Sequence, residues 1–197
     1  MILNAYVVRR SVLVFAAISC LLLSGRPAAA QFGLFRGGKV QYKVFKDAAG
    51  RFEVEYPNKD WNALTTGGSA IAILASKDQA ATLVIDLSKL TEPLAPGEVP
   101  TNHKIELQVL KDQNPTAKEF ADEIVDSKAG VKGSMIKYLR VGAKGPERVS
   151  HFTIGVGLEL YRLDAVVSEA ANAKYDAILN YMLLSFKAPA GPAGSKD

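Results

Sequence analysis

The side chains best suited to chemistry in this chain are its two histidines and a pair of closely spaced glutamates. His103 and His151 are the only histidines among the 197 residues, and neither has a second histidine or a cysteine at ligand spacing. Structural zinc sites take about four nitrogen or sulfur ligands. We therefore expect each histidine to cap a helix or to pack within the fold, and we keep only His151 as a candidate metal ligand.

Glu53 and Glu55 lie two residues apart in an alternating segment, so a strand would point both carboxylates to the same side. Two carboxylates could bind calcium or act as an acid–base pair. A solvated strand face, with Arg51 beside the two acids, is the simpler interpretation. No calcium-binding loop occurs in the sequence. A second acidic cluster is also interpreted as surface: Asp122, Glu123 and Asp126.

The sequence contains no motif typical of an enzyme. A serine hydrolase of the common α/β type would need a Gly-x-Ser-x-Gly turn, which is absent. Gly67-Gly68-Ser69 is too short for a phosphate-binding loop and is not followed by lysine. We therefore predict no catalytic residues, no cofactor and no enzyme activity.

The first thirty residues predict export. Arg9 and Arg10 precede an uncharged apolar run, which is followed by three alanines that end at Ala30. This order is typical of a secretory signal peptide cleaved between Ala30 and Gln31. The apolar run is shorter than the ~20 residues that span a membrane. The general secretory route is favoured, although adjacent arginines also occur in twin-arginine signals.

The only cysteine, Cys20, lies inside the predicted signal peptide. Cleavage after Ala30 would leave a mature protein without a thiol or a disulfide. The alternative is a lipoprotein acylated on Cys20, which would stay attached to a membrane. Loss of the three arginines in the signal peptide leaves 21 basic and 20 acidic residues. A nearly neutral domain offers no electrostatic basis for binding nucleic acid.

We divide the chain into a signal peptide over 1–30, a flexible leader over 31–39, one domain over 40–187 and a disordered tail over 188–197. Alternating apolar residues predict strands over 42–46, 51–56, 70–75, 81–87, 134–141, 148–156 and 158–167. Trp61 is assigned to a loop after Pro57, and the segment containing Pro93, Pro96 and Pro100 is assigned to another loop.

Helices are predicted over 102–113 and 172–186, and the second has an apolar stripe that includes Ile178 and Leu179. The segment 116–128 is interpreted as a short helix, with a strand from Ile124 as the alternative. About seven strands and two or three helices, without βαβ alternation, indicate an α+β fold with a mostly antiparallel sheet packed between helices.

The last third of the chain resembles a known family in the order of its elements. Gly145-Pro146-Glu147-Arg148 opens one strand, and Leu160-Tyr161-Arg162-Leu163 lies in the next. Lys174-Tyr175 begins a helix that ends at Ser185-Phe186. This order resembles the PsbP-like family, which includes the extrinsic oxygen-evolving protein PsbP of photosystem II, with its C-terminal-type domain, and bacterial relatives. The hairpin at 42–56 and the glycines at 130 and 133 fit the same family.

The resemblance implies an α-β-α sandwich, no catalysis, and docking on a protein partner such as photosystem II at a membrane surface. Plant members help to retain calcium and chloride at the manganese cluster, so calcium is implied here by resemblance only. Those members carry a metal-associated histidine where this chain has Arg148. An arginine cannot serve as a metal ligand at ordinary pH, so that site is not carried over.

The predicted function is therefore that of an exported, non-enzymatic accessory domain. It would act in the periplasm or outside the cell, or in the thylakoid lumen if the source is photosynthetic. Two alternatives remain: a lipid-anchored assembly or stress factor of the cell envelope, and a periplasmic hydrolase or ligand-binding enzyme.

Overall fold

The structure is a computed structural model that describes residues 40–66 and 70–189 of the chain. The predicted signal peptide with its Ala30–Gln31 cleavage site, the predicted leader, and residues 190–197 of the predicted tail lie outside the described residues. Residues from Gln41 onward belong to one structural unit.

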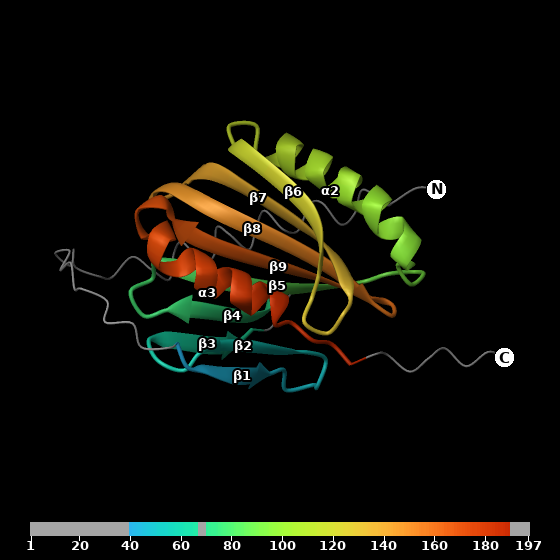
Figure 1. Ribbon diagram of the computed structural model, residues 1–197, viewed down its shortest axis with the longest axis horizontal. Coiled ribbons are helices and arrows are strands. Elements are labelled where there is room, and N and C mark those ends of the chain that lie inside the picture. The colour runs from blue at the N-terminus through green and yellow to red at the C-terminus, as the bar shows by residue number, and fades with distance from the viewer. Residues whose placement is uncertain (1–39, 67–69, 190–197) are drawn as a thin grey trace. The chain divides into compact units, whose positions relative to one another are not determined.

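Seven strands form an antiparallel sheet in the order β3-β4-β5-β9-β8-β7-β6 (Figure 1). Short turns join most neighbours, as antiparallel pairing allows. The strands are β3 (Trp61–Thr65), β4 (Ala70–Ser76), β5 (Ala81–Lys89), β6 (Lys118–Asp126), β7 (Lys132–Gly142), β8 (Gly145–Val156) and β9 (Glu159–Ser168). A separate hairpin consists of β1 (Tyr42–Lys46) and β2 (Glu53–Pro57).

Helix α3 (Asn172–Leu184) covers one face of the sheet with apolar side chains. Figure 1 shows this helix crossing in front of the strands. The residues that α3 buries are Tyr175, Leu179, Met182 and Leu183. They join a large core that contains sheet residues such as Phe152 and Leu163, and hairpin residues such as Phe52 and Val54.

Helix α2 (Val99–Gln113) lies against the other face, beside β6 and β7 (Figure 1). Its half-buried Leu107 and Leu110 pack on a small cluster formed by Ile136, Tyr138 and Val149. These sheet residues alternate along their strands with residues of the large core, so the two helices lie on opposite faces. The predicted α+β fold with a sheet between helices is therefore confirmed.

Two predictions of local structure are wrong. The segment 116–128 does not form a helix, because Lys118–Asp126 pairs with β7 as strand β6. A bulge lies between Lys118 and Ala121, and Glu119 has a φ of 56°. This extra residue changes the strand's alternation into the three- and four-residue spacing of a helix.

Trp61 is the second error, because it begins strand β3 and is buried instead of lying in a loop. The turn before it needs Asp60 at a φ of 62°, a conformation that aspartate tolerates better than most residues. Helix α2 also begins earlier than predicted, with Pro100 in its first turn. Proline is tolerated there, since the first turn's N–H groups have no partner within the helix.

Candidate functional site

The predicted site residues Glu53 and Glu55 share one face of the hairpin, as expected from their spacing. Each carboxylate already has a partner. Glu53 lies 2.8 Å from the ammonium of Lys46. Glu55 accepts a hydrogen bond from the Tyr181 hydroxyl and lies 3.8 Å from the Lys128 ammonium. Glu53 therefore pairs within the hairpin, whereas Glu55 joins the hairpin to α3 and to Lys128.

These carboxylates do not fit the calcium that the family resemblance implies. Calcium usually takes six to eight oxygen ligands, whereas Glu53 and Glu55 face lysines and a tyrosine. Within residues 40–66 and 70–189, no group of three or more histidine, cysteine, aspartate or glutamate side chains is arranged to hold a metal ion. We therefore assign no function that depends on calcium.

The two histidines lie at the same interface, between α2 and the sheet. His103, on α2, has its Nδ1 2.7 Å from the Ser134 hydroxyl on β7 and its Nε2 2.9 Å from the Asp122 carboxylate on β6. Its burial follows from its place on the inner face of the helix. His103 therefore links the helix to two strands.

His151 is the centre of a buried ionic cluster that sequence reasoning missed. We call Glu106, His151, Asp164 and Arg162 the ionic cluster. His151 Nδ1 lies 2.6 Å from Asp164 on β9, and its Nε2 lies 3.0 Å from the Thr153 hydroxyl and 3.8 Å from Glu106 on α2. Antiparallel pairing of β8 with β9 sets His151 directly opposite Asp164.

The carboxylates keep His151 positively charged. Burial alone would lower the pKa of His151, but the adjacent Asp164 and Glu106 outweigh it and raise this pKa to about 10. The charge of His151 affects the two carboxylates in turn. Burial alone would raise the pKa of Asp164 and the pKa of Glu106, but the adjacent His151 holds both pKa values below their ordinary values. The cluster therefore holds ionised groups at neutral pH.

Arg162 connects the ionic cluster to Ser88 and Asp86 on the neighbouring strand β5. Arg162 donates a hydrogen bond to the Ser88 hydroxyl at 3.0 Å, and its Nε lies 4.0 Å from Glu106. Asp86 pairs with Arg162 in register on β5. Burial, together with the nearby charge of Asp164, raises the pKa of Asp86 to about 6. Asp86 therefore takes up a proton within the range of mildly acidic pH.

The order Thr153–His151–Asp164 matches that of a hydroxyl–imidazole–carboxylate triad. In a triad the imidazole must be neutral, since it accepts the proton of the nucleophile. Here His151 is held in its charged form, and Thr153 is only 2% exposed. This arrangement joins a helix to a sheet, and the positive charge on His151 opposes a general-base role at neutral pH.

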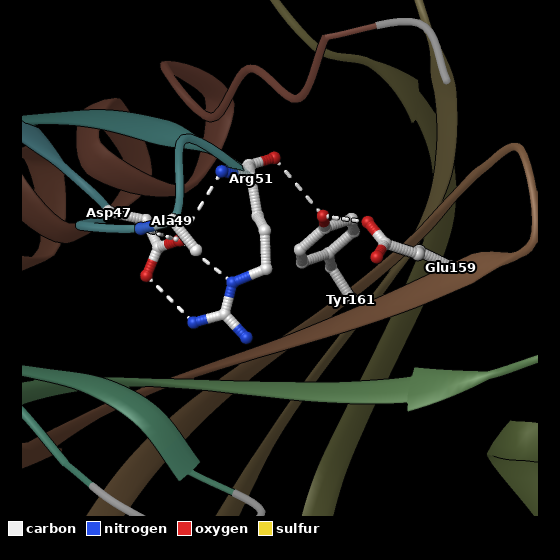
Figure 2. Close-up of polar contacts among 5 residues, drawn as sticks. All are labelled: Asp47, Ala49, Arg51, Glu159 and Tyr161. Carbon is white, nitrogen blue, oxygen red and sulfur yellow. Dashed lines mark hydrogen bonds and ion pairs between the residues drawn. The ribbon is translucent and has the colours of Figure 1, made fainter. Parts of the chain in front are cut away.

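A second polar cluster ties the hairpin turn to β9 (Figure 2). The buried carboxylate of Asp47 accepts two hydrogen bonds from the Arg51 side chain, at 2.7 and 2.8 Å, and one from the N–H of Ala49. The Tyr161 hydroxyl donates to the Arg51 carbonyl at 3.1 Å and also contacts Glu159. Arg51 holds the pKa of Asp47 below its ordinary value. All of these groups point toward one another, so we assign this cluster a structural role.

One sequence pattern indicates part of the ionic cluster. Arg162 and Asp164 alternate in β9 with the buried Tyr161 and Leu163, and they therefore share a face. The pairing of β8 with β9 then brings His151 to the same face. The contribution of Glu106 had no such signal, because no sequence pattern shows which face of the sheet α2 would cover.

Structural comparison shows the PsbP-like fold. No protein-family model matches the chain, and no curated protein matches it in sequence. The solution structure of cyanobacterial PsbP (CyanoP) from Synechocystis sp. PCC 6803 matches 83% of this chain and 99% of its own, with a TM-score of 0.58 and 13% identity. The predicted resemblance is therefore confirmed in the fold.

Two further structures match in the same way. LpqN, described as involved in cell envelope biogenesis of Mycobacterium tuberculosis, matches over 77% of this chain and 93% of its own, with a TM-score of 0.54 and 16% identity. A protein from Bacteroides thetaiotaomicron matches over 79% of this chain and 50% of its own, with a TM-score of 0.55 and 15% identity. The fold thus occurs in bacteria of very different kinds.

Proposed function

We propose that this protein is an exported, non-enzymatic binding domain that docks on a protein partner in the cell envelope. The observation that carries the proposal is the match of the backbone to cyanobacterial PsbP over nearly all of that chain. A fold hosts many functions, so the partner has to be argued separately. The envelope is favoured because residues 1–30 have the order of a signal peptide and because LpqN is described as involved in cell envelope biogenesis.

The polar groups of the structure support a binding role over a catalytic one. The ionic cluster uses its charges for contacts between α2 and the sheet, and the Asp47 cluster uses its charges to hold the hairpin turn. No helix among the described residues is long and apolar enough to cross a membrane. By its likeness in fold to PsbP, we infer peripheral attachment to a membrane complex, as for an extrinsic subunit. If the source is photosynthetic, photosystem II is the first partner to test.

Export and docking can be tested together in the source organism. We would express the tagged full chain, crosslink whole cells and purify the protein from solubilised envelopes, with a version lacking residues 1–30 as the control. We expect one stoichiometric envelope partner with the full chain and none with the control. Recovery of the full chain alone from every fraction would contradict docking.

The intact mass of the purified protein tests the mature form. A chain that starts at Gln31 supports cleavage, and a chain that carries acylated Cys20 supports the lipoprotein alternative.

A periplasmic hydrolase is the second candidate, and the Thr153–His151–Asp164 order is the observation in its favour. The purified mature protein would be assayed with small activated esters, beside His151→Gln and Thr153→Val. Since His151 is charged, we expect hydrolysis no faster than with an equal amount of an unrelated folded protein. Turnover that both substitutions abolish would establish the hydrolase instead.

A further inference from the structure

Asp86 lies beside the ionic cluster without a partner of its own. It stands directly opposite Arg162 in the pairing of β5 with β9. The Arg162 side chain is nevertheless directed elsewhere, because it donates to the Ser88 hydroxyl at 3.0 Å and its Nε lies 4.0 Å from Glu106. Among the described residues, the Asp86 carboxylate makes no ion pair and no hydrogen bond. A half-buried carboxylate is thus left unpaired next to a guanidinium group.

Asp86 and the ionic cluster lie on the same face of the sheet. The neighbours of Asp86 along β5, Ile85 and Leu87, pack into the large core, so Asp86 points to the opposite face. Pairing in register then forms one row across β5, β9 and β8, which consists of Asp86, Arg162 and Thr153. Asp86 is therefore held beside the cluster by the strand pairing itself.

The charges that surround Asp86 offer no cation to spare. The charged groups that face it come from β9, β8 and α2: Arg162, Asp164, His151 and Glu106. Two of them are cations and two are acids, so their charges cancel. Further along the sheet Arg140 and Glu147 pair with each other, and on β4 the register partner of Asp86 is the uncharged Ala70. Ionised Asp86 therefore adds one negative charge that is not offset, and a proton on its carboxylate removes that charge.

We propose that Asp86 is a proton-binding site and that its protonation decides which carboxylate Arg162 faces. With Asp86 ionised, Arg162 turns toward Asp86 and away from Glu106. With one proton from water on Asp86, Arg162 keeps the arrangement seen in the structure, bonded to Ser88 and close to Glu106. Arg162 stays positively charged in both states. This inference does not depend on the proposed docking function.

Proton uptake by Asp86 stabilises the fold in mildly acidic solution. Burial and the charge of Asp164 raise the pKa of Asp86 in the folded state to about 6, against an ordinary value of about 3.9. The stabilising effect is complete below the ordinary pKa and is lost as pH rises through about 6. Between pH 7.5 and pH 5, this group alone should raise the equilibrium constant for folding about ten-fold.

Urea unfolding of the purified protein at these two pH values, beside Asp86→Asn, tests the proton site. Asparagine cannot ionise, so the folding constant of the unmodified protein divided by that of Asp86→Asn should rise about ten-fold on acidification. Glu92→Gln replaces an exposed carboxylate in the loop after β5, and the same ratio for this matched control should stay constant. A constant ratio for Asp86→Asn would overturn the proposal.

NMR titration of the unmodified protein tests the exchange of partners, and it remains decisive if Asp86→Asn does not fold. The carboxyl carbon of Asp86 should titrate with a midpoint near pH 6, and the Nε signal of Arg162 should shift with the same midpoint. In Asp86→Asn the Arg162 signal should stay constant between pH 7.5 and pH 5. An Asp86 midpoint below about 5 would overturn the proton site. An Arg162 signal that does not follow Asp86 would overturn the exchange of partners.

Discussion

Two helices cover opposite faces of one sheet in this protein, and they are held there by different forces. Helix α3 buries four large side chains in a core that also contains the stacked rings of Phe52 and Phe186. Helix α2 buries one valine and one histidine, and it places Glu106 over the charged His151. The face under α3 is apolar, whereas the face under α2 combines a small apolar cluster with the ionic cluster.

This difference between the two faces indicates which of them contributes more to specifying the fold. Each fully buried apolar side chain contributes about 1.5–3 kcal/mol, and this contribution does not depend on an exact partner. A buried ion pair contributes little net stability but is costly to break, because the remaining charge is left without a partner. The α3 face can therefore specify the fold, while the α2 face tolerates changes only where its buried charges keep their partners.

The largest expected effect comes from placing the same charge under each helix. Leu179→Asp buries an unpaired carboxylate in the main core and should abolish cooperative folding. Leu107→Asp, at a half-buried position of α2, should lower the free energy of unfolding by only about 1–3 kcal/mol, within the usual range for single substitutions. Urea unfolding followed by circular dichroism measures both. Equal effects of the two substitutions would remove the distinction between the faces.

His151→Ala breaks the ionic cluster from within. The substitution leaves Asp164 and Glu106 buried without their cationic partner, so we expect the free energy of unfolding to fall by about 3–5 kcal/mol. Arg148→Ala, which removes an exposed pair with Glu169, is the control and should change stability by less than about 1 kcal/mol. A small effect of His151→Ala would mean that the cluster is not charged.

Alkaline pH should weaken the same cluster in the intact protein. The pKa of His151 is raised in the folded state, so its stabilising effect is complete below its ordinary pKa of about 6.5 and is lost as pH rises through about 10. Between pH 8 and 10 this loss amounts to about 2–3 kcal/mol. Thermal unfolding would measure it as the difference between the unmodified chain and His151→Ala. A difference that stays constant over this range would contradict the assignment.

The sequence predicts the structure on the α3 face of the sheet better than the structure on the α2 face. The apolar stripe of α3, with Leu179 and Met182, follows from helical spacing alone, and this helix was predicted to within two residues of its end. Strand β6 is only an alternative in the sequence analysis, from Ile124, because a bulge at Glu119 hides its alternation. The ionic cluster depends on which helix covers His151, and that choice is made by tertiary packing between segments far apart in the chain.

Metal ions should have the smallest effect. The candidate ligands Glu53, Glu55 and His151 all have protein partners, so saturating calcium or zinc should leave the melting temperature almost unchanged. A ligand at a hundred times its Kd would stabilise by about 2.7 kcal/mol. A shift of that size that disappears in the double substitution Glu53→Gln and Glu55→Gln would identify a metal site on the hairpin. A shift that disappears in His151→Ala would identify a metal site in the ionic cluster.

The central claim is that the face under α2 is organised around a charged histidine. Nitrogen-15 NMR of the imidazole rings tests this directly, because the chain has only two histidines and His103→Gln assigns the signals of His151. We predict that both ring nitrogens of His151 stay protonated at pH 8 and that deprotonation begins only as pH approaches 10. A neutral His151 ring at pH 8 would contradict the claim.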